Sequence, residues 1–173
     1  MTKSTIYSSK YLNVVKDGTW EYVTRTTGKD VVYIVPVTCN KFGEPEFVFI
    51  RELRIPMQQF VVGFPAGLVG DLGDEEIITA AYRELEEETG YQAGRMRHLV
   101  SGPPSAGLSD ETIHFYLADK LTKVGIGGGD DSEDIDVIRV PVHKAESWLA
   151  SRSDSIDIKS YLGLWFASRM DLE

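Results

Sequence analysis

The sequence predicts an α/β sandwich with a mixed central sheet. The expected elements follow one another in the order strands, helix, strands, helices, which is typical of a sheet covered by helices on its faces. The chain has 173 residues, of which 42% are hydrophobic and 26% are charged, an ordinary composition for a globular domain with its own core. We therefore expect a single domain over residues 1–173.

The first strands of the sheet are expected before residue 65. Residues 20–37 are rich in β-branched and aromatic side chains and are interrupted at Gly28, a pattern that predicts two strands joined by a turn. Two further runs of the same kind follow at 46–53 and 58–64. The next stretch is rich in proline and glycine and is expected to be irregular.

One helix is expected from about Glu75 to Thr89. Asp74 suits the N-cap, acidic residues suit the first turn, and Gly90 suits the left-handed position after the last turn. Apolar residues at helical spacing should pack on the sheet. They are Ile77, Ile78, Ala81 and Leu85.

The second half of the chain predicts three more strands and two helices. A short loop rich in glycine and acidic residues separates the second of these strands from the third. The strands are expected at 95–101, 111–121 and 135–142, and the helices at 143–151 and 156–170.

The long helix carries a cluster of glutamates, RELEEETG from Arg83 to Gly90. At 100° per residue, Glu84, Glu87 and Glu88 share one flank of the helix beside its apolar stripe. Like charges at this spacing repel by roughly a few tenths of a kcal/mol each unless a cation offsets them. Mg²⁺ takes one or two carboxylates together with water and phosphate oxygens, so this flank suits a magnesium site, in which Arg83 could orient a glutamate. The alternative is a solvated acidic face.

The remaining composition narrows the function classes. A net charge of −9 argues against nucleic-acid binding, which usually needs a basic stripe. No apolar run approaches the roughly eighteen residues that cross a bilayer, and no targeting segment is recognisable, so we expect a cytoplasmic protein with no membrane partner. Cys39, the single cysteine, excludes an internal disulfide and is expected in the core. The three histidines, His98, His114 and His143, lack metal-ligand spacing and are expected to be structural.

The glutamate cluster belongs to a longer and more specific pattern. The run E-x7-R-E-L-x-E-E-x-G-Y resembles the Nudix signature at each of its fixed positions, which are Glu75, Arg83, Glu84, Leu85, Glu87, Glu88, Gly90 and Tyr91. One departure lies in the preceding loop, where Val69 stands at the family's glycine position and Gly67 is the better counterpart, leaving a two-residue insertion.

This resemblance implies a Nudix-like α/β/α sandwich and a hydrolase of nucleoside diphosphates linked to another group. It implies Mg²⁺ as the cofactor, with Mn²⁺ as a substitute. Glu84 and Glu88 correspond to metal ligands and Glu87 to a further or water-bridged ligand. Arg83 and Glu75 correspond to orienting residues.

Segments outside the signature, from about Thr19 to Pro141, resemble the ADP-ribose (ADP-sugar) pyrophosphatase branch of the family. Among them are TWEYVTRTTGKD, IRELRIPMQQFVVGFPAGLVGD, AGLSDETIHFY and DSEDIDVIRVP. This branch implies that Ala66 offers its backbone carbonyl to a metal. Substrate contacts are implied for Trp20 on the adenine, for Glu21 and Arg25 around the base, and for Arg54 on the diphosphate. It also implies a homodimer in which an N-terminal β extension, about residues 1–30, completes the partner's adenine site.

The expected reaction is attack of water on the diphosphate of ADP-ribose or a related ADP-sugar, giving AMP and a sugar phosphate. The resemblance implies that a glutamate on a mobile loop activates the water. Glu133 is its best counterpart, Asp131 and Glu111 are rivals, and the glycines at 127–129 would let the loop close. The expected catalytic set is therefore Glu133, Arg83 and Glu87. The alternatives are another nucleoside diphosphate sugar such as GDP-mannose, or a non-catalytic sensor that binds ADP-ribose.

Overall fold

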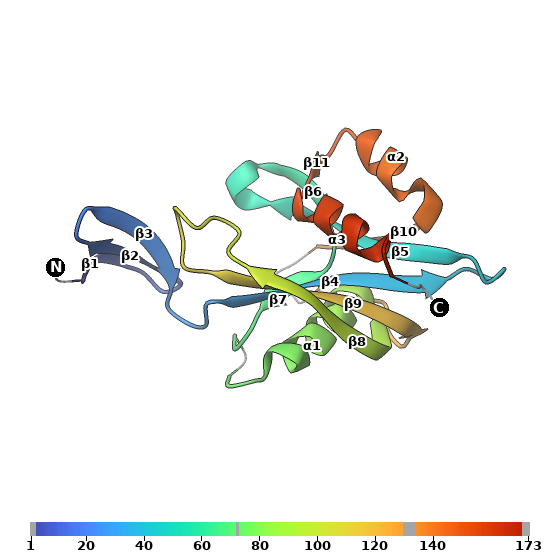
Figure 1. Ribbon diagram of the computed structural model, residues 1–173, viewed down its shortest axis with the longest axis horizontal. Coiled ribbons are helices and arrows are strands. Elements are labelled where there is room, and N and C mark those ends of the chain that lie inside the picture. Colours follow the sequence, from blue (N-terminus) through green and yellow to red (C-terminus); the bar gives the residue numbers. More distant parts are fainter. Residues whose placement is uncertain (1–2, 72, 130–133, 171–173) are drawn as a thin grey trace.

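A computed structural model describes residues 3–71, 73–129 and 134–170 and confirms the predicted α/β sandwich. Within these residues, a mixed sheet of eight strands lies between helix α1 (Ile77–Thr89) on one face and helices α2 (Ala145–Ala150) and α3 (Lys159–Ala167) on the other (Figure 1). A second sheet, of three described strands, extends from the body at the N-terminal end.

The bounds of the remaining elements follow the chain. The N-terminal sheet contains β1 (Ser4–Ser8), β2 (Leu12–Asp17) and β3 (Trp20–Arg25). The main sheet contains β4 (Asp30–Cys39), β5 (Pro45–Arg54), β6 (Gln59–Gly63), β7 (Ala66–Leu68), β8 (Tyr91–Gly102), β9 (Thr112–Lys123), β10 (Asp136–Pro141) and β11 (Ser155–Ile156). Single 3₁₀ turns, η1 (Ile55–Met57) and η2 (Val142–Lys144), follow β5 and β10.

The main sheet forks beside strand β4. Its order is β11-β6-β5-β4-β9-β8, with β10 added to β5 and β7 added to β4. The pairs β4–β9 and β11–β6 are parallel, and the other pairs are antiparallel. Strand β4 pairs with β5 only at residues 37–39 and with β7 only at residues 31–33. From residue 50 onward, β5 pairs with β6 instead, so β4–β7 and β5–β6 diverge and leave a space between them.

Two hydrophobic cores lie on the two faces of the sheet. Val32 and Ile34 of β4 pack in the core that contains the apolar stripe of α1. Tyr33 and Val35 pack in the opposite core, which contains Ala167 of α3. Because both faces of the sheet are covered at β4, this strand is a continuous run of mainly apolar residues rather than an alternation of apolar and polar ones.

Helix α1 differs from the prediction at its start. It begins at Ile77 rather than Glu75, and Glu76 occupies the N-cap position with an extended backbone and no side-chain cap, so Asp74 is not the cap. Glu75 is instead engaged outside the helix, as described below. Gly90 ends the helix in the left-handed conformation, φ 68°, as predicted.

Several local predictions were wrong. Ile78 is 44% exposed, and Ala80 takes its place in the buried stripe, because Ala80 and not Ile78 lies one turn before Glu84 on the sheet side of the helix. Cys39 is exposed because it is the last residue of β4, where the strand runs into the turn at Asn40. The segment 156–170 is not one helix, because its first residue extends the short strand β11. Among the described residues, no helix is long and apolar enough to cross a membrane.

Candidate active site

A cavity of about 470 Å³ occupies the fork of the sheet. Its walls come from strands β3 to β7 and β9, from helix α1, from the first residue of α3, and from segments that connect these elements. The charged side chains that line it among the described residues are Arg25, Arg54, Arg83 and Lys159, together with Glu52, Asp71, Glu84, Glu87, Glu111 and Asp157. Acidic groups outnumber basic ones, so a phosphorylated ligand needs added positive charge to enter.

Arg83 organises the acidic end of the cavity. Its Nη1 donates to Glu84 Oε1 at 2.9 Å and to Glu87 Oε2 at 3.0 Å. Its Nη2 donates to Asp71 Oδ1 at 2.9 Å and to Glu75 Oε1 at 2.8 Å. Glu75 also accepts a hydrogen bond from the backbone N–H of Gly70 at 3.0 Å, which ties the preceding loop to the same network. This is why Glu75 is not part of the helix.

Burial and hydrogen bonding shift the pKa values of the groups in this network in different directions. Burial lowers the pKa of Arg83, but its carboxylate partners outweigh burial and hold that pKa above its usual range. The hydrogen bond from Arg83 lowers the pKa of Glu75. Glu84 behaves differently, because its burial raises its pKa to about 7, and Arg83 only partly opposes this. One guanidinium shared among several carboxylates does not fully offset the burial of Glu84, which is 7% exposed.

Gly67 and Ala66 of β7 lie against the glutamates of α1. A Cβ added to Gly67 would lie 1.9 Å from Cδ of Glu84, so only glycine fits at this position while Glu84 lies there. The backbone N–H of Ala66 donates to Glu88 Oε2 at 3.0 Å, and Glu88 is almost fully buried. These contacts hold β7 against the helix.

The donor set at this end of the cavity suits a hard divalent cation. The side chains gathered around Arg83 offer carboxylate oxygens, which Mg²⁺ prefers. Burial disfavours the ionised form of Glu84 and Arg83 only partly opposes this, so a cation beside Glu84 would stabilise its charge. In the described part of the chain, no group of three His, Cys, Asp or Glu side chains is arranged to hold a metal ion, because the carboxylates face Arg83. The chemistry therefore fits a cation that competes with Arg83 for Glu84 and Glu87.

The residues expected to bind substrate are only partly brought together. Arg25 lines the cavity, where its Nε lies 2.6 Å from Glu111 Oε1, and Arg54 lines it beside its ion-pair partner Glu52. Trp20 is 64% exposed and does not line the cavity.

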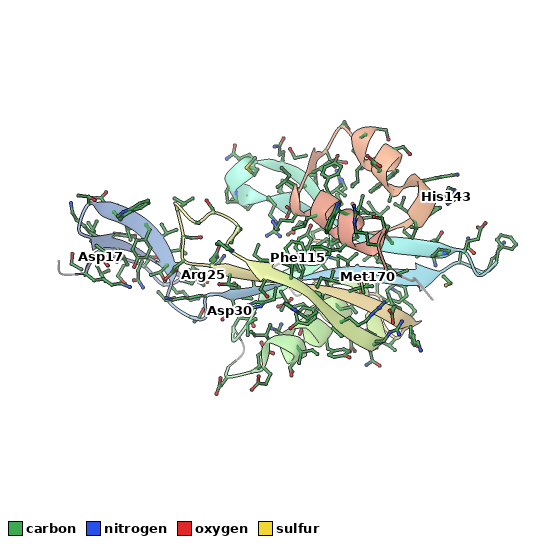
Figure 2. All side chains as sticks on the ribbon, in the orientation of Figure 1. Asp17, Arg25, Asp30, Phe115, His143 and Met170 are labelled. Carbon is green, nitrogen blue, oxygen red and sulfur yellow. The ribbon has the colours of Figure 1, made fainter. Side chains whose placement is uncertain are left out.

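Trp20 and Glu21 lie at the far end of strand β3 from Arg25. Trp20 pairs with Asp17, and Glu21 forms an ion pair with Lys16 at 3.3 Å. Figure 2 shows Asp17 on the N-terminal extension, away from the body, and Arg25 where the extension meets it. Trp20 and Arg25 are five strand steps apart, a distance of about 16 Å. Within one chain, therefore, Trp20 does not reach the cavity.

The glycines expected to give the catalytic loop its mobility are packed against helix α1. Gly128 N–H donates to the carbonyl of Glu88 at 2.9 Å, and Gly129 N–H to that of Glu87 at 3.1 Å. A Cβ on Gly127 would lie 2.4 Å from the carbonyl carbon of Thr89, and Gly127 has φ 74°. Their small size thus permits close backbone contact. Glu133 and Asp131 lie outside the described residues.

Sequence reasoning missed Asp157 and Lys159, which line the cavity from the α3 side. The prediction of one helix over 156–170 concealed them. An available signal was the aspartate two residues before the lysine, because Asp side chains often accept a backbone N–H two residues on at a turn or helix start. The structure shows this bond, from Lys159 N–H to Asp157 Oδ1 at 3.0 Å.

The chain is similar to proteins of one family. The profile of the NUDIX domain matches residues 29–160. Relatives include "Methanol dehydrogenase activator" of Bacillus methanolicus, 36% identical over 64% of this chain and 59% of that protein, and "ADP-ribose pyrophosphatase" of Bacillus subtilis, 33% identical over 63% and 58%. "ADP-sugar pyrophosphatase" of Mus musculus is 31% identical over 85% of this chain and 69% of that protein.

The chain thus spans less than two thirds of the length of the two bacterial relatives. Among solved structures, "Crystal structure of ADP compounds hydrolase" superposes with a TM-score of 0.78 at 21% identity, covering 98% of this chain and 91% of that chain. At this identity the likeness establishes the fold.

Proposed function

The chain belongs to the Nudix family, and from that membership we propose that it hydrolyses the diphosphate of ADP-ribose or a related ADP-sugar, giving AMP and a sugar phosphate. The observation that carries the proposal is the cavity in the forked sheet, where the signature carboxylates of α1 meet Arg25 and Arg54. Carboxylates that suit a divalent cation and arginines that suit phosphate are the two kinds of group that phosphoryl transfer requires. The relatives named as ADP-ribose and ADP-sugar pyrophosphatases support this choice of substrate.

The proposed cofactor is Mg²⁺, for which Mn²⁺ can substitute. Glu84, Glu87 and Glu88 would hold it, together with the backbone carbonyl of Ala66. A bound divalent cation polarises phosphoryl oxygens and lowers the pKa of a coordinated water. Arg83 would keep two partners in the loop, Asp71 and Glu75, if Glu84 and Glu87 bound the cation, so its guanidinium would stay beside the site.

The other residues of the cavity position the substrate. Arg54 would bind the diphosphate, and Arg25 would line the base site. Glu133 is the proposed general base on grounds of sequence resemblance. Glu111 is its rival on grounds of geometry, because it lines the cavity and is held by Arg25. Glu133→Gln and Glu111→Gln distinguish these two candidates, since loss of the general base should lower kcat by about 10²–10⁴.

We further propose a homodimer in the cytoplasm, in which the N-terminal extension of one chain reaches the cavity of the other. The extension exposes large apolar side chains, including Ile6, Tyr7 and Tyr11, which a partner would cover. Trp20 is too far from its own cavity to stack on a base bound there, whereas a partner's Trp20 is not limited by that distance. Light scattering that shows an active monomer would contradict this arrangement.

A substrate panel tests the proposed activity. ADP-ribose, ADP-glucose and GDP-mannose are incubated with the protein and Mg²⁺, and the products are identified by chromatography. AMP and ribose 5-phosphate from ADP-ribose are the expected products, and Glu88→Gln should abolish most of the turnover. A preference for GDP-mannose would show that the substrate is a GDP-sugar and not an ADP-sugar. Binding of ADP-ribose without any product would identify a sensor instead of an enzyme.

A further inference from the structure

The cavity is reached from both faces of the sheet. Its acidic end belongs to α1, whose buried residues pack with Val32 and Ile34 of β4. Asp157 and Lys159 belong to the start of α3, which packs on the opposite face with Tyr33 and Val35. The fork between β4–β7 and β5–β6 joins the two sides. A ligand whose diphosphate lies at the α1 side can therefore extend toward the α3 side.

Asp157 and Lys159 form one compact polar unit in the cavity wall. Lys159 Nζ lies 2.5 Å from Asp157 Oδ2, while Oδ1 of the same carboxylate accepts the Lys159 backbone N–H at 3.0 Å. The ammonium also lies 5.2 Å from the centre of the Tyr33 ring, a cation–π distance. Both side chains remain partly exposed to the cavity.

The backbone beneath this unit is firmly positioned. Strand β11 pairs with β6 in parallel, and Asp157 N–H continues that ladder to the carbonyl of Val62 at 2.8 Å. The Tyr33 hydroxyl lies 2.9 Å from Ser160 Oγ and accepts the Phe64 N–H at 3.2 Å. Helix α3 approaches the sheet so closely that a Cβ on Gly163 would lie 2.9 Å from Phe64 and Val35 side chains. A ligand thus meets a preformed pair.

We propose that Asp157 and Lys159 are specificity-determining residues that bind the hydroxyl groups of the sugar attached to the substrate's diphosphate. This inference rests on the proposed function. It concerns the sugar, which is the part of the substrate that the signature residues are not expected to bind. The pair offers a carboxylate acceptor beside an ammonium donor, which matches adjacent sugar hydroxyls, each of which both donates and accepts.

The charge of the pair favours a neutral ligand over a further phosphate. The carboxylate and the ammonium nearly cancel at 2.5 Å, so the unit offers directed hydrogen bonds with little net attraction for an anion. Among the described residues that line the cavity, acidic side chains outnumber basic ones, which disfavours a second anion that no bound cation neutralises. A sugar is therefore the better occupant of this end.

The test compares two substrates that share the diphosphate. ADP-ribose carries the sugar, and the methyl ester of ADP carries a methyl group in its place. Lys159→Met and Asp157→Asn should each lower kcat/KM for ADP-ribose about 10- to 100-fold, mainly through KM, and leave kcat/KM for methyl-ADP within about twofold. Asn keeps an oxygen for the Lys159 N–H, so the start of α3 should survive. Lys144→Met, on an exposed lysine outside the cavity, is the matched control.

Binding measurements separate this inference from the proposed activity. Calorimetry with ribose 5-phosphate and with AMP needs no turnover. Each variant should bind ribose 5-phosphate at least tenfold more weakly than wild type and bind AMP unchanged, with the thermal midpoint of Lys144→Met as reference for folding. Equal losses for both ligands or both substrates, no loss at all, or no binding of ribose 5-phosphate to wild type would overturn the sugar subsite. Absence of hydrolysis with a selective loss of sugar-phosphate binding would overturn only the proposed activity.

Discussion

Replacing Glu84 by glutamine should stabilise the metal-free protein at pH 8. Burial raises the pKa of Glu84 from 4.5 to about 7, and each pKa unit corresponds to 1.36 kcal/mol, so ionised Glu84 is disfavoured by about 3 kcal/mol in the folded state. Between these two pKa values the folded protein binds the proton more tightly than the unfolded chain does. The contribution of Glu84 to stability is therefore intact below about pH 4.5 and declines as the pH rises to about 7.

Urea unfolding in EDTA at pH 5 and at pH 8 measures this effect. Glutamine imitates the protonated carboxyl, so Glu84→Gln should match wild type within about 1 kcal/mol at pH 5 and exceed its free energy of unfolding by up to about 3 kcal/mol at pH 8. In thermal melts this corresponds to roughly 6–12 °C. Glu86→Gln is the control, because Glu86 is exposed and the same substitution should change stability by about 0.5 kcal/mol or less. A variant no more stable than wild type at pH 8 would refute the reasoning.

Three further substitutions test separate parts of the structure. Gly67→Ala should lower Mg²⁺-dependent turnover more than about tenfold, because its Cβ would overlap the Glu84 carboxyl, and a steady-state assay measures this. Gly127→Ala should cost clearly more unfolding free energy than Gly43→Ala in urea titrations. Both glycines have positive φ, 74° and 82°, but an added Cβ meets backbone atoms at Gly127 and nothing at Gly43. Gly43→Ala therefore suffers only the backbone strain of a positive φ, about 1 kcal/mol. Trp20→Ala should raise KM for ADP-ribose with kcat little changed, since base stacking is remote from the reacting phosphorus; a fall in kcat at constant KM would contradict this.

The elements that local pattern specifies were predicted well. The body of α1, its end at Gly90 and the runs of β4 and β5 follow from periodicity and glycine placement, which depend on neighbours in sequence. The start of α1 was wrong because a contact outside the helix decided it. Glu75 has good propensity for a first turn, yet its bonds to Arg83 and Gly70 hold it in the loop.

The shape of the site could not be predicted in the same way. Its cavity exists because β4 changes partner from β7 to β5, a choice that depends on pairings between residues 6 to 10 positions apart for β5 and 33 to 37 positions apart for β7. Asp157 enters the site only because β11 adds to β6 in parallel, roughly 95 residues away in sequence. The signature glutamates were identifiable because they lie on one short helix. The opposite wall of the same cavity had no comparable local pattern.

Arg83 offsets part of the negative charge of the glutamate cluster, and this determines how the proposed cation can bind. Among the described residues, Arg83 contacts four carboxylates, so the group keeps an excess of three negative charges when all are ionised. Two of the four, Asp71 and Glu75, come from the loop before α1, and the other two, Glu84 and Glu87, come from α1 itself. A divalent cation that takes the two helix carboxylates leaves Arg83 with the two loop carboxylates, so both sets are more nearly neutralised than before. The arginine therefore holds the helix and loop together without the cation and does not have to leave when the cation binds.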